Sequence, residues 1–401
     1  MPDDSDVDLM ILLMVLRLHH QLSATAVSFA RFTLFLSMDD RRRRDRRIPR
    51  IALVDPHESS FFRLYRSGND QAIITVSGFD HRTFSYLLNN FTPLFNRYSP
   101  YCNNNGCLIR QLRNNGSRGG CPRALDPCSC LGLVLCFTRT KGALTVLQLV
   151  FGLSYSVLCL FLKFGIRLLV KILLHEDGAK VIIPSPDIIT EMIHLVEDKF
   201  PSLAGVWCVM DGLKVPIEKP GDYKTQNAYY NGWLHGHFVG CVFVFAPNGL
   251  VVGASVNNPG SWHDSFIAEN SGTYEMLENI FLLTGGKCIV DAAFSLKRCP
   301  FLIKSGKEPS TNLTDAVIVR DAEATSLRQL AEWGMRGLQG SFPCLKEKIT
   351  YSEDFRDRKL FLSLIPMLYN FRTNFVGLNQ IRSHFFPIFE LHGDNVLNAL
   401  V

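Results

Sequence analysis

The sequence lacks the signatures of several large protein classes. Its 12 cysteines include no C-x2-C pair, and the one cluster of cysteines has irregular spacing, which argues against structural zinc. The first residues, MPDDSDVD, are acidic where a secretory signal needs positive charge. We therefore expect a reduced, intracellular protein without a signal peptide. The clustered cysteines are Cys102, Cys107, Cys121, Cys128 and Cys130.

Net charge is absent from the second half of the chain and concentrated in the first. Residues 1–200 carry 24 Lys and Arg against 18 Asp and Glu, whereas residues 201–401 carry 18 against 19. Much of the excess is one run, RRRRDRRIPR from Arg41 to Arg50. Such a run can bind phosphate or a nuclear import receptor, or it can be a solvated arm. A hydrophobic content of 47% with 20% charged residues indicates a globular protein.

The segment before residue 185 has few strong signals. Residues 1–120 contain an apolar stretch, the Arg run and the Asn/Gly-rich NNNG and RNNGSRGG, which predict an irregular leader or linker. Residues 142–162 are uncharged and could cross a membrane as a helix. The FGLS sequence inside them predicts a turn between two helices. Three candidate DNA-binding cations follow the turn at four-residue spacing and would share one helical face: Lys163, Arg167 and Lys171. A buried helix pair, a helix-turn-helix and a membrane span all remain open at this point.

From residue 186 onward, short apolar runs alternate with helical patterns, which predicts an α/β domain with one mixed sheet. Strands are expected at 206–210, 237–245, 250–256, 287–290 and 301–304, and helices at 187–200, 265–282 and 322–340.

Two of these strands end in an acid. VWCVMDG places Asp211, and KCIVDAAF places Asp291; ligands usually bind at such strand ends. The late helix adds Glu332, with Arg328 and Arg336 one turn before and after it, although an exposed salt-bridged face would look the same. If the three acids converge, their hard oxygen ligands point to Mg²⁺ or Mn²⁺, ions suited to phosphodiester cleavage.

The loop NNPGSWHDS, residues 257–265, adds His263 and Asp264. A hydrolytic triad of Ser265, His263 and Asp264 is the weakest reading. Adjacent residues rarely align as nucleophile, base and orienting acid, and the chain has no G-x-S-x-G elbow.

Six segments in order resemble the PIF/Harbinger superfamily of transposases and the nucleases derived from them. The resemblance covers roughly residues 125–382 and implies an RNase H-like mixed sheet flanked by helices, preceded by an all-α helix-turn-helix region. The implied domains are a basic leader at 1–120, the DNA-binding helices at 121–185, the DDE nuclease at 186–385 and a tail at 386–401. The matching segments are WCVMDGLKVPIE, YYNGWLHGHFVGCVFVFAPNG, NNPGSWHDS, GGKCIVDAAF, RQLAEWGMRGLQGSFPCLK and LYNFRTNFVGLNQIR.

Carried onto this sequence, the family's first acid is Asp211 and its last is Glu332. Both Asp264 and Asp291 match middle acids. The strand order of an RNase H-like fold favours Asp291 as the second catalytic acid, which leaves Asp264 as an extra metal ligand or a supporting group. Three further residues are expected to support the site. His263 could position a phosphate or the nucleophile, or hydrogen-bond the loop that shapes the site. Arg328 and Arg336 could hold a DNA phosphate or tune the ionisation of Glu332. The carboxylate ligands favour Mg²⁺ or Mn²⁺ as the metal.

The implied function is a divalent-metal-dependent DNA endonuclease or transposase. It would act on terminal inverted repeats in the nucleus, away from membranes, with a Myb-like accessory protein and as a homo-oligomer. The alternative is a catalytically inactive, domesticated DNA-binding protein with the same fold. DAAF, in place of the family's usual Asp-Ser-Gly/Ala-aromatic pattern, keeps this alternative open.

Overall fold

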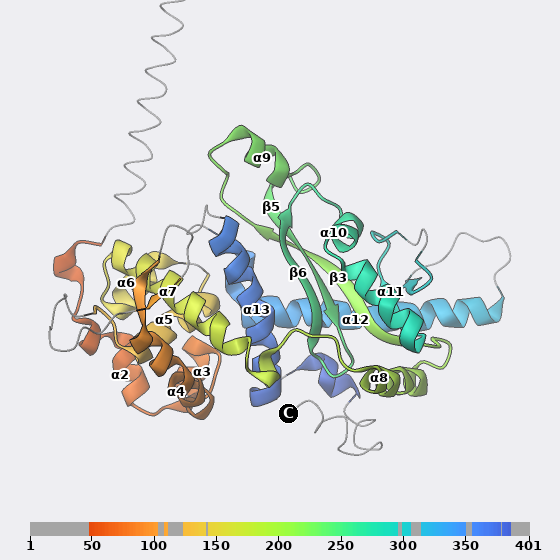
Figure 1. Cartoon of the computed structure of the whole chain (residues 1–401), viewed down its shortest axis with the longest axis horizontal. Coiled ribbons are helices and arrows are strands. Elements are labelled where there is room, and N and C mark those ends of the chain that lie inside the picture. Colours follow the sequence, from red (N-terminus) through yellow and green to blue (C-terminus); the bar gives the residue numbers. More distant parts are fainter. Residues whose placement is uncertain are drawn as a thin grey trace, which may run out of the picture. The chain divides into compact units, whose positions relative to one another are not determined.

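A computed structural model describes residues 48–102, 108–110, 123–141, 143–295, 299–305, 314–349, 355–377 and 379–385 (Figure 1). The chain divides into two units, Met1–Leu53 and Val54–Val401. In the first unit, the described residues form a short 3-10 turn, η1 (Arg50–Ala52). The Arg41–Arg47 part of the basic run lies outside the described residues.

The expectation of an irregular leader was wrong for residues 60–97, which form three helices. In the longest of them, Phe84, Leu87, Phe91 and Phe95 recur every three or four residues and are fully buried, which is helical spacing. The side chain of Asp80 accepts a hydrogen bond from Thr83 N and caps this helix. The elements are η2 (Pro56–Glu58), α2 (Ser60–Arg66), α3 (Asp70–Ser77), α4 (His81–Arg97), β1 (Tyr98–Cys102) and β2 (Leu108–Arg110).

A helix-turn-helix outline follows, as predicted. Helix α6 (Leu144–Phe151) ends at Gly152, whose φ of 67° is left-handed, and α7 (Tyr155–Leu173) starts after a bend of 94°. No single described helix is long and apolar enough to span a membrane, although the bent pair α6 and α7 together meets the length and composition criteria. Most of α7 is buried against other parts of the protein.

Helix α5 (Pro127–Arg139) lies at the centre of this helical region and is buried along nearly all of its length. Cys128 and Cys130 are free thiols on it. Burial raises the pKa of both thiols, which disfavours the thiolate form that binds metal. Cys107 and Cys121 lie outside the described residues.

The rest of the unit is the predicted mixed α/β sheet flanked by helices. The sheet runs β4-β5-β3-β7-β8, and β6 pairs with β5 along the edge opposite β3, since Val242 has Gly212 of β3 and Ser255 of β6 as register partners. β3 is antiparallel to β5 and parallel to β7. Its strands are β3 (Val206–Pro216), β4 (Tyr230–Asn231), β5 (Gly236–Phe245), β6 (Val251–Pro259), β7 (Lys287–Val290) and β8 (Leu302–Lys304). The helices are η3 (Asp177–Ala179), α8 (Pro186–Lys199), α9 (Tyr223–Tyr229), α10 (Asp264–Asn270), α11 (Thr273–Thr284), α12 (Asp315–Ser341), η4 (Pro343–Lys346) and α13 (Phe355–Val376).

Alternate residues of β3 point to two different cores. Val209 and Leu213 join the core that includes α12, α13 and the N-terminal helices. Cys208 and Met210 join a second core with α8, α10 and α11. The sheet is therefore covered on both faces. Trp207 and Cys208 both join the second core, next to a register shift between β3 and β7. From Cys208 onward, each residue of β3 can be assigned to one face by its position in the alternation.

Three elements differ from expectation. β3 continues five residues past Asp211 in its ladder with β5, whereas its parallel pairing with β7 stops at Val209. The expected helix 265–282 is two helices, separated at Gly272 with a φ of 77°. α13, whose buried residues include Pro366 and Asn370, was not expected. The domain boundaries at 120, 185 and 385 stay predictions.

Candidate active site

Asp211 and Asp291 lie just beyond the parallel ladder of two neighbouring strands, Asp211 within β3 and Asp291 directly after β7. Val209 and Ile289 are register partners in the parallel ladder of β3 and β7, and both belong to the core that includes α12. Each acid comes two residues after one of these partners. Because side chains alternate along a strand, both carboxylates are directed to the face of the sheet that α12 covers.

The ionisation of Asp211 reflects this environment. Burial raises the pKa of the Asp211 carboxyl to about 6, and the negative charges of Asp291 and Asp264 add to this increase. The hydrogen bond from Gly212 N and the positive charge of Arg328 act in the opposite direction and lower the pKa. The Gly212 N–H donates to Asp211 Oδ1 at 2.8 Å. Asp211 therefore has excess negative charge around it that a bound cation would relieve.

α12 brings Glu332 to the edge of this face. Leu327 and Ala331 are buried under the helix, and Gly334 packs so closely that a Cβ there would lie 2.6 Å from the Phe245 ring of β5. Glu332, half-exposed beside them, accepts a hydrogen bond from Arg328 at 2.8 Å. Since Arg328 also acts on Asp211, this arginine lies within electrostatic reach of both acids.

Arg336, the other predicted neighbour of Glu332, is exposed. Among the described residues, the ion pair formed by Glu332 is the one to Arg328, one turn earlier in the helix.

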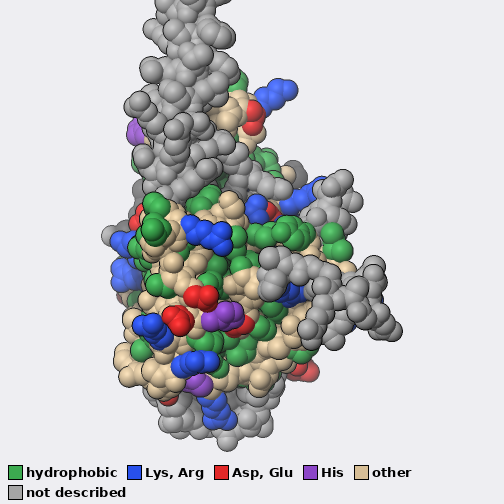
Figure 2. Space-filling model, turned by 90° about the vertical axis from the view of Figure 1, so that its left-hand side faces the viewer, with side chains coloured by type: hydrophobic (Ala, Val, Ile, Leu, Met, Phe, Trp, Pro, Cys, Tyr) green, Lys and Arg blue, Asp and Glu red, His purple; other side chains and the backbone are tan. Residues whose placement is uncertain are grey.

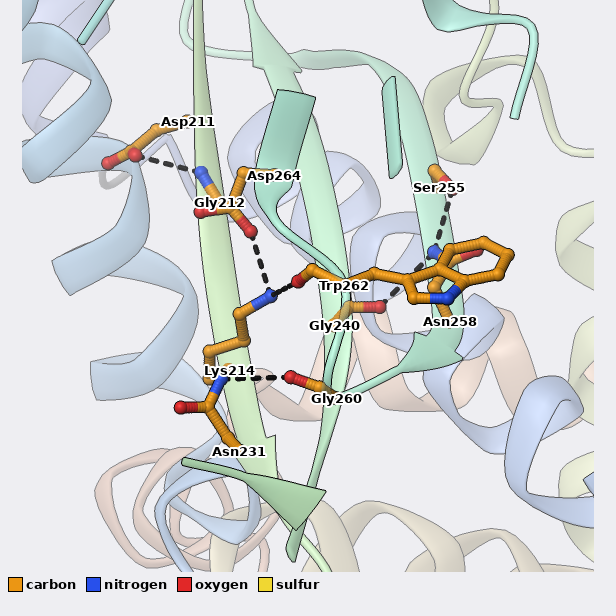
Figure 3. Close-up of polar contacts among 10 residues, drawn as sticks. All are labelled: Asp211, Gly212, Lys214, Asn231, Gly240, Ser255, Asn258, Gly260, Trp262 and Asp264. Atoms are coloured by element: carbon orange, nitrogen blue, oxygen red, sulfur yellow. Dashed lines mark hydrogen bonds and ion pairs between the residues drawn. The ribbon is translucent and has the colours of Figure 1, made fainter. Parts of the chain in front are cut away.

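Asp264 lies on the other side of β3 from Asp211 (Figure 3). It is the first residue of α10, and its carboxylate lies against the backbone of Gly212, where a Cβ would come within 2.2 Å of the carboxylate carbon. Lys214 Nζ forms an ion pair with Asp264 Oδ1 at 2.9 Å and donates to Trp262 O at 2.7 Å. Asp264 therefore has a cationic partner from the protein itself.

Lys214 is a site residue that the sequence reasoning missed. It pairs in register with Gly240 of β5, and a Cβ at Gly240 would lie 3.2 Å from Lys214 Nζ and 2.4 Å from Ile267. Two glycines on neighbouring strands thus make room for the lysine amine, the Asp264 carboxylate and α10. The available signal was the alternation in MDGLK, which puts Gly212 and Lys214 on one face and Asp211 on the other.

The loop before Asp264 is anchored to α13. Asn257 has a left-handed φ of 66°; its Oδ1 accepts from Arg358 Nε and its Nδ2 donates to Phe355 O at 3.1 Å. His263 is exposed and is the N-cap residue of α10, without a side-chain capping bond.

The surroundings of Ser265 argue against a hydrolytic triad of Ser265, His263 and Asp264. Its Oγ bonds with Tyr274 OH at 3.1 Å and accepts from Ser295 N at 3.1 Å. The hydroxyl therefore ties α10 to α11 and to the loop after Asp291, and does not face His263 as a nucleophile would.

The donor chemistry of Asp211 and Asp291 fits a hard divalent cation. Both offer carboxylate oxygens, and the pKa of Asp211 is raised first by burial and then by the charges of Asp291 and Asp264. No group of three His, Cys, Asp or Glu residues is close enough to form a metal cluster within the part of the chain that the structure describes. A pair of carboxylates still suits Mg²⁺, which proteins usually hold through one or two carboxylates together with water and substrate phosphate.

The three candidate DNA-binding cations of α7 share one face, as predicted, but they have partners inside the protein. Asp357 of α13 pairs with Lys163 at 2.8 Å and with Arg167. Lys171 Nζ bonds to Tyr98 OH at 2.9 Å and lies over the Tyr98 ring. The face of the helical region in Figure 2 intersperses basic, acidic and hydrophobic side chains. These cations therefore join α7 to α13 and β1, and their role as DNA contacts stays a prediction.

Residues 210–368 match the family of DDE superfamily endonucleases. The matched segment contains Asp211, Asp264, Asp291 and Glu332, and nucleases of this superfamily generally use divalent metals. The chain has no significant match among curated proteins or solved structures.

Proposed function

We propose that this protein is a divalent-metal-dependent DNA endonuclease or transposase of the PIF/Harbinger type, with Asp211, Asp291 and Glu332 as its catalytic acids. The observation that carries the proposal is the position of Asp211 and Asp291, each two residues beyond the last register pair of β3 and β7, Val209 and Ile289, with the charge of Asp291 acting on Asp211. Both acids lie within a segment that matches the DDE endonucleases. The same proposal places the protein in the nucleus, gives it a Myb-like accessory protein as a partner, and makes it a homo-oligomer.

The roles of the residues follow from their surroundings. Asp211 and Asp291 would hold Mg²⁺ or Mn²⁺, which when bound activates water or a hydroxyl and stabilises the leaving oxygen of a phosphodiester. Arg328 would hold the Glu332 carboxylate in place and could meet a DNA phosphate. Asp264, already paired with Lys214, would position the strand that carries Asp211 from its other face.

The test is nicking of supercoiled plasmid by the full chain in Mn²⁺. Asp211→Asn, Asp291→Asn and Glu332→Gln should each reduce nicking to background while leaving salt-sensitive DNA binding in place. Asp315→Asn, which removes an exposed acid from the start of the same helix as Glu332, is the matched control and should nick normally.

Nicking that none of the three substitutions changes would refute the nuclease. DNA binding without nicking in the unsubstituted chain would favour the inactive DNA-binding protein instead.

A further inference from the structure

A group of exposed aromatic side chains surrounds the short β4–β5 hairpin, away from the acids. Trp233 is 91% exposed and Tyr223 of α9 is 76% exposed, and Tyr230 and Leu234 are also exposed. Single exposed apolar residues need no explanation, but four within one segment indicate a contact surface.

The hairpin carrying Trp233 is held in one conformation. Asn231 Oδ1 accepts from the backbone N–H groups of Trp233 and Leu234 at 3.1 and 3.0 Å. Asn231 Nδ2 donates to Gly260 O at 2.9 Å (Figure 3), and Ser261 N donates to Ala228 O at 3.2 Å. An aromatic ring presented on a fixed turn binds with little loss of conformational entropy.

Basic side chains lie beside these rings. Ile217 N donates to His237 O, and Glu218 N donates to Ile349 O, so the strand ends that carry Lys219, His237 and Lys348 run side by side. Both lysines are exposed, and burial together with their positive charges lowers the pKa of His237. The His237 ring meets the Tyr230 ring edge-on at 5.5 Å. We call Tyr223, Tyr230, Trp233, Lys219, His237 and Lys348 the hairpin surface.

We propose that the hairpin surface binds a single-stranded segment of nucleic acid, with Trp233 stacked on an unpaired base and Lys219 and Lys348 next to its phosphates. Aromatic rings interleaved with lysines are how proteins hold single strands without reading their sequence. A protein partner could pack against the aromatic rings, but it would leave the two neighbouring lysines, Lys219 and Lys348, without a role.

The hairpin surface shares strand β5 with the candidate active site, and the identification of the strand as DNA substrate rests on the proposed function. β5 carries Phe243 opposite Asp211 and His237 opposite Tyr230. The six residue steps from His237 to Phe243 span about 20 Å of strand, or about six nucleotides. A strand freed near the acids could therefore reach Trp233.

The test is anisotropy of a labelled single-stranded oligonucleotide of about 16 nucleotides with the full chain in EDTA. Trp233→Ala should weaken binding at least about fivefold and Trp233→Phe should restore most of it, because one stacking contact is lost and regained. Lys219→Gln with Lys348→Gln should reduce the salt slope by about 1.4. Tyr101→Ala, an exposed aromatic on β1, and Lys141→Gln, an exposed lysine after α5, are the matched controls and should change neither quantity.

Unchanged single-strand affinity in Trp233→Ala would overturn the proposal. A change of oligomeric state in Trp233→Ala, measured by light scattering, would also overturn it, because it would assign the surface to a second copy of the chain. An equal loss of affinity for duplex DNA would also overturn it. Because binding is measured without metal, it is independent of nicking. If Asp211→Asn, Asp291→Asn and Glu332→Gln all leave nicking intact while Trp233→Ala loses affinity for the single strand, the nuclease is refuted and the hairpin surface stands.

Discussion

The carboxylate of Asp264 occupies the space beside Gly212 that a side chain would fill, with a Cβ at residue 212 only 2.2 Å from the carboxylate carbon. Gly212 therefore separates two acids: Asp211 on the α12 face of β3, and Asp264 with its partner Lys214 on the α10 face. This contact links the MDG and HDS motifs directly.

Substituting Gly212→Ala should force α10 away from β3. Overpacking of this kind costs about 1–3 kcal/mol, so urea unfolding should show a loss of stability in that range. Gly221→Ala is the control, since a Cβ there meets nothing within 4 Å. Equal stability of the two variants would mean that Asp264 does not rest on β3.

The pKa of Asp211 predicts how stability depends on pH. Because its folded pKa is about 6, above the ordinary value of 3.8, the folded state binds this proton more tightly than the unfolded state. The resulting stability is fully present below pH 3.8 and is lost as pH rises through about 6.

Asp211→Asn should therefore be more stable than the unsubstituted chain at pH 8, by at most about 3 kcal/mol, and should match it near pH 4. Denaturant unfolding across this range in EDTA measures the difference. Asp315→Asn, at an exposed site, should stay within about 0.5 kcal/mol throughout. A variant less stable than the parent at pH 8 would contradict the raised pKa.

Asp357 should matter for folding because it joins α13 to α7. Its side chain is 10% exposed and pairs with both Lys163 and Arg167. Asp357→Ala would leave two cations without their partner, which costs about 3 kcal/mol for a buried pair. A double-mutant cycle with Arg167→Gln should show coupling, whereas one with Lys141→Gln should be additive. If Asp357→Ala unfolds with the same free energy as the unsubstituted chain, the two ion pairs do not stabilise the fold, and Lys163 and Arg167 would be better explained as DNA contacts.

The sequence was informative where a pattern is local. The apolar runs HFVGCVFVF and KCIV predicted β5 and β7, and acids after apolar runs pointed to Asp211 and Asp291. The 3.6-residue period of Leu327, Ala331 and Leu338 predicted the helix that carries Glu332. In each case neighbouring residues alone determine the element.

What the sequence could not supply was pairing across distance. Lys163 and Arg167 had the spacing of a groove-binding face, but their partner, Asp357, lies 190 residues away from Arg167. Lys214 acquires its role from Asp264 and from Gly240, which are brought together by strand register and by the start of α10. The N-terminal helices were obscured by the Asn/Gly-rich segments around them, although Phe84, Phe91 and Phe95 had helical spacing.

Addition of metal should distinguish Asp264 from Asp291 as the second acid. A ligand that binds only the folded state, at about one hundred times its Kd, adds about 2.7 kcal/mol. Mn²⁺ should therefore raise the melting temperature of the unsubstituted chain at pH 7.5, and should do so least in Asp211→Asn and Asp291→Asn, which lose a carboxylate ligand. Asp264→Asn should be less stable without metal, because Lys214 loses its partner, yet should keep the Mn²⁺-induced shift. Loss of that shift in Asp264→Asn and its retention in Asp291→Asn would make Asp264 the second metal ligand, and would mean that Lys214 must release it when the ion binds.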